Sequence, residues 1–303
     1  MNYKVILESI FEELKTAPKF GKVSNTIPEL AKINPAKFGL HLTTIDGNNF
    51  GVGDCNEKFS IQSISKALTL ALAFTFLGEK IWQRVGVEPS GNAFNSLIQL
   101  EYEKGIPRNP FINAGALVIA DVLVSHLKNP KQDFLAFIRK ISGVETINYN
   151  EKVAISEKET GFRNAALANF LKSFGNIKND VNTVLDFYFY QCALEMSCAE
   201  LTQSFYLFAN EGKTRSNLQI LTASEVKRLN AIMQVCGFYD ESGEFTYKVG
   251  LPGKSGIGGG IVALLPKNYV VATWSPLLNN KGNSALGMLA LEKLTTKTGL
   301  SVF

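Results

Sequence analysis

Apolar and polar residues alternate near both ends of the chain, as they do in strands of a sheet. Residues Phe38–Ile45 alternate in this way, Asp46–Asn49 is a hairpin turn signal, and Phe50–Gly53 begins the returning strand. Strand character returns in the last sixty residues, where Pro266–Asn268 supplies a further turn. The predicted strands there are Phe245–Val249, Ser255–Leu265 and Tyr269–Ser275.

Between these strand regions, apolar residues recur at the spacing of helices. Two further helices are expected near the ends of the chain, at Asn2–Lys15 and Ser284–Lys297. The helices expected in the middle are Ala114–Leu127, Lys131–Ser142, Glu151–Thr160, Asn164–Phe174, Asp180–Gln191, Cys198–Asn210 and Ala223–Val235.

Strands at both ends and helices in the middle predict an α/β chain of the α+β kind. We expect one antiparallel five-stranded sheet of two N-terminal and three C-terminal strands. The terminal helices should cover one face of this sheet and the helical middle should cover the other. The prediction is a single domain over residues 1–303, with a sheet subdomain at about 1–60 and 240–303 and a helical subdomain at about 61–239.

One predicted helix, Ser60–Leu77, is apolar on nearly every side and should therefore be buried between the sheet and the other helices. Ser60 is a candidate N-cap, and Gly78 is the residue type that commonly follows a helix end. The N-terminus of this helix should open at the junction of the two subdomains, which is a common place for a pocket.

The first turns of this helix contain Ser63 and Lys66, three positions apart and so on one face. A serine hydroxyl becomes a good nucleophile only when a base takes its proton. Burial lowers the pKa of a lysine, so Lys66 could be neutral near pH 7 and act as that base. The alternative is a lysine that extends from a core helix to water, and the pair alone is weak support for catalysis.

Composition narrows the function classes. The net charge is +4 and the lysines and arginines are scattered, which does not favour nucleic-acid binding. No apolar stretch is long enough to span a membrane, and the N-terminus lacks the apolar core of a signal peptide, so a cytoplasmic protein is expected. Four separate cysteines predict free buried thiols, and two distant histidines, His41 and His126, do not favour a metal site or a histidine-based triad.

A glycine-rich stretch, Pro252–Gly260, opens the predicted strand Ser255–Leu265. It is not a phosphate-binding loop of the Walker type, because the spacing G-x-x-x-x-G-K-[ST] that this motif requires is not met. Its glycines could let a substrate approach the backbone, and an unpaired N–H near Ile257 could donate to a carbonyl oxygen. The alternative is a structural bulge at the start of a strand.

Ser63-x-x-Lys66 and Lys254-Ser255-Gly256 together resemble the superfamily of serine β-lactamases and penicillin-binding DD-peptidases. The chain is much more closely similar to one branch, the serine-dependent glutaminase family. The similar blocks follow the family order from about residue 20 to the end of the chain. They are Val87–Ser96, Asn109–Ala116, Ser156-Glu157 with Arg163-Asn164, Tyr188–Cys192, Cys236–Asp240, Gly250–Gly260 and Trp274–Ser284.

This resemblance implies hydrolysis of L-glutamine to L-glutamate and ammonia through a glutamyl-serine acyl-enzyme. It implies Ser63 as nucleophile, Lys66 with Tyr188 as general base and acid, and the backbone N–H groups of Ser63 and Ile257 as oxyanion hole. It also implies no cofactor, no metal, and a homo-oligomer, either a dimer or a homotetramer. The implied substrate-binding residues are Ser63, Asn113, Glu157, Asn164, Tyr188, Tyr239 and Ile257, supported by Lys254, Ser255 and Gly256.

The chemistry of free glutamine suits these residue types. Its ammonium needs a carboxylate such as Glu157, and its carboxylate needs donors such as the Asn113 and Asn164 amides. Two other classes compete with this interpretation. A β-lactamase, peptidase or esterase of the same superfamily would not need the residues that recognise a free amino acid, and a catalytically silent binding protein would not need both Ser63 and Lys66.

Overall fold

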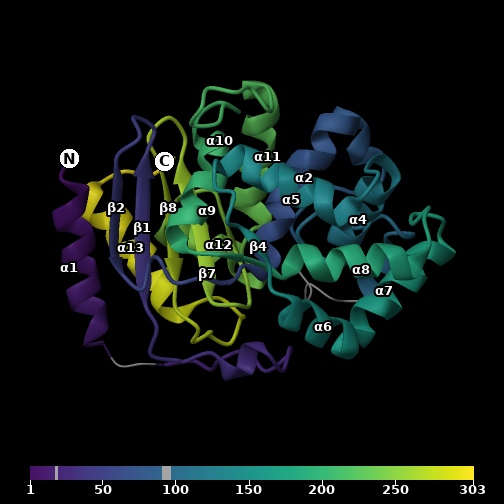
Figure 1. The fold of residues 1–303 in the computed structure, drawn as a ribbon, viewed down its shortest axis with the longest axis horizontal. Helices are drawn as coiled ribbons and strands as arrows, with labels where there is room; N and C mark the ends of the chain where they lie inside the picture. The colour runs from purple at the N-terminus through teal and green to yellow at the C-terminus, as the bar shows by residue number, and fades with distance from the viewer. Residues whose placement is uncertain (18–19, 91–96) are drawn as a thin grey trace.

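The computed structural model describes residues 1–17, 20–90 and 97–303 of the chain. A β-sheet with its covering helices lies beside a group of helices, and the two chain ends lie on the sheet side of the molecule (Figure 1). This mixed architecture agrees with the α+β fold expected from the sequence.

The main sheet has five strands in the order β2-β1-β8-β7-β6, and each neighbouring pair is antiparallel. Two strands come from the N-terminal region and three from the C-terminal region, so the predicted origin of the strands is confirmed. The strands are β1 (Gly39–Thr44), β2 (Asn49–Gly53), β6 (Gly253–Ser255), β7 (Gly260–Leu265) and β8 (Tyr269–Trp274).

Two of the predicted C-terminal strands were assigned incorrectly. Residues 245–248 belong to a helix, α12 (Ser242–Lys248), and Val249 follows it directly. Phe245 and Val249 are buried, while Tyr247 is exposed. A spacing of four is helical, and a run this short is ambiguous between the two periods. The predicted strand 255–265 divides into β6 and β7, because a turn at 256–259 with Gly259 at φ +89° reverses the chain.

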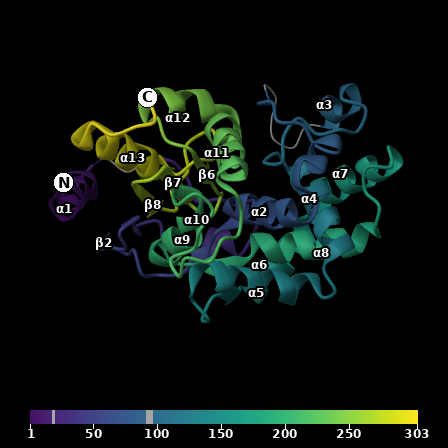
Figure 2. The ribbon, with the colours of Figure 1, turned by 90° about the horizontal axis from the view of Figure 1, so that it is seen from above.

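The two faces of the sheet are covered by different parts of the chain, as predicted. Helices α1 (Tyr3–Lys15) and α13 (Ala285–Thr298) pack on one face with α12 (Figures 1 and 2). Helices α9 (Cys198–Ser204) and α10 (Tyr206–Ala209) pack on the other face. Successive side chains of β7 point to opposite faces of the sheet. Ile261 packs in the core under α1 and α13, and Val262 packs in the core on the side of α9.

The remaining helices form the other part of the molecule, and most of the helices predicted in the middle of the chain are confirmed to within a few residues. The segment 198–210 differs, because it divides into α9 and α10, and the short α3 was not predicted. These helices are α2 (Ser65–Leu77), α3 (Leu97–Tyr102), α4 (Asn113–His126), α5 (Pro130–Ser142), α6 (Glu151–Thr160), α7 (Phe162–Ser173), α8 (Val181–Cys192) and α11 (Ala223–Cys236).

Helix α2 is buried on nearly every side and packs against α4, α5, α8 and α11, as its apolar composition predicts (Figure 2). It begins at Ser65 rather than Ser60, and residues 62–64 form a single 3₁₀ turn before it. Ser60 is not its N-cap. It lies in the short strand β3 (Phe59–Ser60), where its hydroxyl donates to the Cys192 carbonyl at 3.0 Å.

Strand β3 joins a second, smaller sheet with β5 (Leu194–Met196) and β4 (Asn148–Tyr149), in the order β3-β5-β4. This sheet joins the segment before α2 to the segment before α6 and to the segment after α8. The 3₁₀ turn therefore starts from a fixed strand. In the described parts of the chain, none of the helices has both the length and the apolar character needed to cross a membrane.

Candidate active site

A cavity of about 340 Å³ opens at the junction between the sheet and the helical part, at the N-terminal end of α2. Its walls come from segments far apart in the sequence, from the loop before β1 to the turn after β6. The predicted nucleophile and all of the predicted substrate-binding residues line it. These are Ser63, Asn113, Glu157, Asn164, Tyr188, Tyr239 and Ile257.

Ser63 lies in the 3₁₀ turn immediately before α2, so it is close to the positive end of the helix dipole. The residue before it, Gln62, has φ +50°, a left-handed conformation that is uncommon for a residue other than glycine. The Gln62 amide donates to the Ser60 hydroxyl at 2.9 Å, and this bond holds the turn to β3. A strained conformation next to a reacting group is a frequent feature of functional sites.

Lys66 is 1% exposed, and its ammonium donates to the Phe111 carbonyl at 3.2 Å and to Asn113 Oδ1 at 2.7 Å. Burial lowers the pKa of Lys66 to about 8. At pH 7 about one molecule in ten would then carry the neutral amine, so the neutral form expected near pH 7 is the minor one. The neutral form predominates above about pH 8.

The segment before α4 is shaped to place these two acceptors. Asn109 accepts backbone N–H bonds from Phe111 at 3.0 Å and from Ile112 at 3.1 Å, and this fold of the chain points the Phe111 carbonyl at Lys66. Asn113 continues the chain of contacts by donating to Asn164 Oδ1 at 2.9 Å. The orientation of both amides in the cavity is thereby fixed.

Glu157 on α6 is 6% exposed, although it carries a carboxylate. Burial raises the pKa of Glu157 to about 8, and the nearby Lys66 charge and a hydrogen bond from Gln62 act in the opposite direction. One carboxylate oxygen, Oε2, has no hydrogen-bond partner among the described residues. A buried acceptor left without a partner costs free energy, so this oxygen is suited to a cationic group that enters from the cavity.

Two tyrosines contribute different contacts. Tyr188 on α8 is buried, its hydroxyl lies beside the Cys192 thiol, and burial raises its pKa well above the usual 10. Tyr239 follows α11, and its hydroxyl lies beside the hydroxyls of Ser63 and Ser255. Burial raises the pKa of Tyr239 to about 12, and the neighbouring hydroxyls of Ser63 and Ser255 limit the rise. Of the two, Tyr239 is the tyrosine beside the candidate nucleophile.

Lys254 and Ser255 lie on β6, behind Tyr239. The fully buried Lys254 ammonium donates to the Gly237 carbonyl at 2.9 Å and to the Ser255 carbonyl at 2.7 Å. It lies 4.6 Å from the centre of the Tyr239 ring, within reach of a cation–π contact. Burial, and after it repulsion from Lys66, lowers the pKa of Lys254 well below its usual value.

Two backbone N–H groups belong to residues of the cavity wall on adjacent turns. The residues that carry them, Ser63 and Ile257, both line it, and within the described chain neither N–H donates a hydrogen bond. A carbonyl oxygen placed between them would gain two donors, the arrangement that an oxyanion hole requires.

The glycines beside Ile257 allow a close contact within the chain. A Cβ on Gly256 would lie 2.4 Å from the Ile61 carbonyl oxygen, and one on Gly258 would lie 2.2 Å from that of Ser60. The close neighbour of these two glycines is therefore the chain's own backbone before α2, and approach of a substrate to this strand stays a prediction. This contact brings the turn after β6 against the turn that carries Ser63.

We expect Gly256→Ala to lose both stability and activity. The added methyl group would meet a backbone oxygen and would also lie 3.3 Å from the Ser63 nitrogen, so the two turns must separate. Overpacking of this kind costs about 1–3 kcal/mol of unfolding free energy. Thermal melting and ammonia release measure the two effects, with Gly243→Ala as the control because nothing lies within 4 Å of a Cβ there. A Gly256→Ala enzyme with wild-type stability and turnover would contradict the required close contact.

Other residues of the cavity were not singled out in the sequence. Gln62 is adjacent to Ser63 and could have been found by that position, but nothing in its type signals a left-handed backbone. The others come from a predicted loop and from helix ends, where only the fold brings them to the site. They are Thr26, Ile27, Thr160 and Gly161, whereas Arg163 and Cys192 stand in the blocks similar to the family but were given no role there. Of the block 87–96, residues 91–96 lie outside the described residues.

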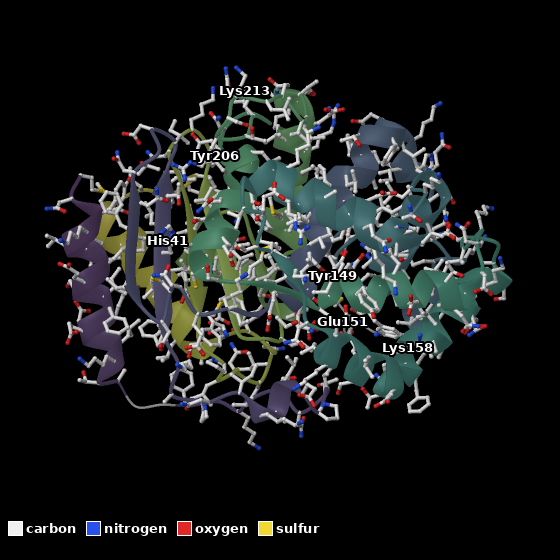
Figure 3. All side chains as sticks on the ribbon, in the orientation of Figure 1. His41, Tyr149, Glu151, Lys158, Tyr206 and Lys213 are labelled. Carbon is white, nitrogen blue, oxygen red and sulfur yellow. The ribbon has the colours of Figure 1, made fainter. Side chains whose placement is uncertain are left out.

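The histidines and cysteines take no part in a metal centre in the described parts of the chain, where no group of three or more His, Cys, Asp or Glu side chains could hold an ion. His41 lies on β1 (Figure 3), with Nδ1 2.9 Å from the Thr202 hydroxyl of α9, and burial lowers its pKa to about 4. His126 bonds to the Val122 carbonyl of its own helix. All four cysteines are buried and free, as predicted.

The chain is similar over its whole length to proteins of one kind. The sequence profile of a family described as Glutaminase matches residues 21–303. A protein named Glutaminase from Christiangramia forsetii is 59% identical, and one from Saccharophagus degradans is 56% identical. The alignment covers all of this chain in both cases, with 100% and 99% of the respective relatives.

Solved structures agree with this result. A structure titled as the probable glutaminase ybaS has a TM-score of 0.94 at 32% identity, over 99% of this chain and 97% of that one. A probable glutaminase from Bacillus subtilis, complexed with 6-diazo-5-oxo-L-norleucine, has a TM-score of 0.85 at 30% identity, over 99% of this chain and 94% of that one.

Proposed function

Because the chain belongs to the glutaminase family and has its amide-hydrolysing activity, we propose that it converts L-glutamine to L-glutamate and ammonia through a glutamyl ester of Ser63. The single observation that carries this proposal is the Glu157 carboxylate. It is buried, one of its oxygens has no partner among the described residues, and it lines the same cavity as Ser63. A carboxylate placed in this way suits the ammonium of a free amino acid.

The rest of the cavity suits the rest of glutamine. The amide groups of Asn113 and Asn164 are joined to each other and line the wall near Lys66, where they can receive the substrate carboxylate. The side-chain amide of glutamine would then extend toward Ser63. A cavity of about 340 Å³ is of the size that small-molecule sites have.

In the first chemical step, the Ser63 hydroxyl attacks the side-chain amide carbon and loses its proton to a base. Lys66 is the base in this proposal, because burial favours its neutral amine. The proton can reach the leaving nitrogen through Lys66 or a tyrosine hydroxyl. The role predicted for Tyr188 stays a prediction, and Tyr239 is a second candidate because its hydroxyl lies beside that of Ser63.

Negative charge on the amide oxygen would be stabilised by the Ser63 and Ile257 N–H groups. Such preorganised donors are usually the largest single contribution to catalysis of acyl transfer. Ammonia leaves, and water then hydrolyses the ester in a step that uses the same base and the same donors. The product is L-glutamate, and the Ser63 hydroxyl of the enzyme is regenerated.

Turnover of several substrates tests the proposal against related activities. We expect ammonia release from L-glutamine, and little from L-asparagine, because its side chain is one methylene shorter and would not reach Ser63 from the same ammonium and carboxylate contacts. A β-lactamase or esterase would instead hydrolyse nitrocefin or a simple ester. Nitrocefin turnover without glutamine turnover would overturn the proposal.

We expect Glu157→Gln to weaken recognition of L-glutamine. The variant removes the charge that would face the substrate ammonium, and a hydrogen bond to a charged group is worth about 1.5–3 kcal/mol, or roughly ten- to a hundredfold in kcat/KM. Glu159→Gln is the matched control, because Glu159 lies on the same helix but is exposed. Unchanged kcat/KM in the Glu157 variant would show that this carboxylate does not bind substrate.

We also propose that residues 1–303 act as one glutaminase domain and that the protein assembles as a homo-oligomer, a dimer or a tetramer. The family match over residues 21–303 supports the first statement. Sedimentation velocity tests the second, and a monomer at assay concentration would overturn it.

A further inference from the structure

The turn at residues 237–241, called here the tyrosine turn, holds Tyr239 in an unfavourable backbone conformation. Tyr239 has φ +53°, in the left-handed region that glycine favours. A bulky residue remains there only when its surroundings hold it in place. Because Tyr239 and Ser63 line the same cavity, with the tyrosine hydroxyl beside the serine, whatever holds the tyrosine turn also sets the position of that hydroxyl.

Glu241, two residues after Tyr239, is a buried carboxylate with an unusual set of partners. It is 8% exposed, and the partners that the described chain gives its oxygens are asparagine amides. Its oxygens accept from Asn279 Nδ2 at 3.0 and 2.9 Å, and from Asn283 Nδ2 at 2.5 Å. A buried carboxyl group is costly, so two amides that make three contacts with it indicate a specific positional requirement.

The two asparagines connect this carboxylate to both sides of the tyrosine turn. Asn283 also donates to the Phe238 carbonyl at 3.2 Å, next to Tyr239. Asn279 Oδ1 accepts the backbone N–H groups of Lys281 at 2.9 Å and of Asn283 at 3.1 Å, which fixes which end of its amide faces Glu241. The loop formed in this way lies against the tyrosine, since a Cβ on Gly282 would be 3.8 Å from Cε2 of the Tyr239 ring.

We propose that Glu241 is a positioning residue for the hydrolytic reaction, acting through Asn279 and Asn283 to hold Tyr239 with its hydroxyl at Ser63. Glu241 is not among the described residues that line the cavity of Ser63. The inference rests on the serine mechanism proposed above, because its readout is the contribution of Tyr239 to that mechanism.

Exchanging donor and acceptor across one contact tests this role. In Glu241→Gln, the new amide N–H₂ would face the N–H₂ of Asn279, which cannot turn over without losing its two backbone bonds. We expect kcat to fall about tenfold. Asn279→Asp alone places two carboxylates together and should cause a similar loss. The double variant Glu241→Gln/Asn279→Asp restores a donor opposite an acceptor, and we expect kcat within about threefold of wild type.

A second measurement separates positioning of Tyr239 from general stabilisation. In a Tyr239→Phe background the hydroxyl is already absent, so Glu241→Gln should lower kcat by no more than about twofold. Glu244→Gln is the matched control, because Glu244 lies three residues further on, is exposed and pairs with Lys248 at 2.7 Å. It should keep wild-type kcat. Thermal melting accompanies each variant, and if Glu241→Gln does not fold, the half-buried Asn279→Ala carries the same comparison in both backgrounds.

The tenfold loss, its rescue in the double variant and its absence in the Tyr239→Phe background together support the proposal. An unchanged kcat in Glu241→Gln, or an equal loss with and without the Tyr239 hydroxyl, overturns it. Failure of the serine mechanism is a separate result, because Ser63→Ala would then remain active whatever the Glu241 variants do. With the mechanism correct and the positioning role wrong, Ser63→Ala is inactive while Glu241→Gln turns over normally.

Discussion

Ser63→Ala will hydrolyse L-glutamine at least about 10⁴-fold more slowly than the wild-type enzyme, while its fold and its melting temperature stay unchanged. The loss should be this large because the proposed ester cannot form without the hydroxyl, and the remaining donors at Ser63 and Ile257 stabilise only an uncatalysed attack by water. Ser63 is itself half-buried at the cavity wall, between the buried Gln62 and Ile64, so removing its oxygen leaves no large void in the core.

A matched variant separates loss of the nucleophile from damage to the turn. Ser65→Ala removes a buried hydroxyl two residues later, in the first turn of α2. This hydroxyl is not part of the proposed chemistry, and we expect kcat within about threefold of wild type. Retention of more than about a tenth of wild-type kcat in Ser63→Ala, a change of at most ~1.4 kcal/mol in the barrier, would contradict covalent catalysis at this position.

Lys66→Arg will be nearly inactive, with a loss of about 10²–10⁴-fold in kcat, although it keeps a positive charge. A guanidinium does not lose its proton at working pH, so it cannot accept the proton of Ser63. Lys66→Met is the companion variant, because it fills a similar volume without a base, and both variants need a melting curve since the site is 1% exposed. Substantial ammonia release by a folded Lys66→Arg enzyme would move the role of base to Tyr239 or Tyr188.

The same assignment predicts how activity depends on pH. Lys66 must lose a proton to act as base and Glu157 must lose one to bind an ammonium, and burial places the pKa of each near 8. Catalytic efficiency, kcat/KM, should therefore rise with pH through about 8, with the two ionisations coupled. In Glu157→Gln only one ionisation remains, so the rise should be shallower. A profile that is flat between about pH 6 and 9 would contradict both assignments.

The sequence was informative about the fold where patterns were long and one-sided. Helix α2 is apolar nearly throughout, and it is buried as expected, while the alternation of β1 and β8 places their side chains on two covered faces of one sheet. Short segments were less certain. The five residues at 245–249 contain buried apolar side chains four positions apart, a spacing that both a strand and a helix allow. In the structure these side chains pack as part of a helix against the core beside α13.

The sequence predicted which residues line the site, but it did not predict which of them contact one another. Similarity to a family identified Ser63, Glu157 and Ile257 from segments almost two hundred residues apart, and these residues do line one cavity. The pairing of Tyr239 with Ser63, and the left-handed backbone of Gln62 and Tyr239, depend on how three turns meet, which no local pattern records. Those contacts decide which tyrosine lies next to the nucleophile.

Covalent labelling tests the central claim, that Ser63 is the nucleophile, most directly. The diazoketone analogue of glutamine, 6-diazo-5-oxo-L-norleucine, places an electrophilic carbon where the side-chain amide of the substrate would lie. After inactivation of the wild-type enzyme, peptide mass spectrometry with fragmentation should find one label per chain, on the Ser63 oxygen. L-Glutamine should slow the labelling, and Ser63→Ala should take up none. A label on the Cys192 thiol or on the Tyr239 hydroxyl, both of which lie at the same cavity, would contradict the account.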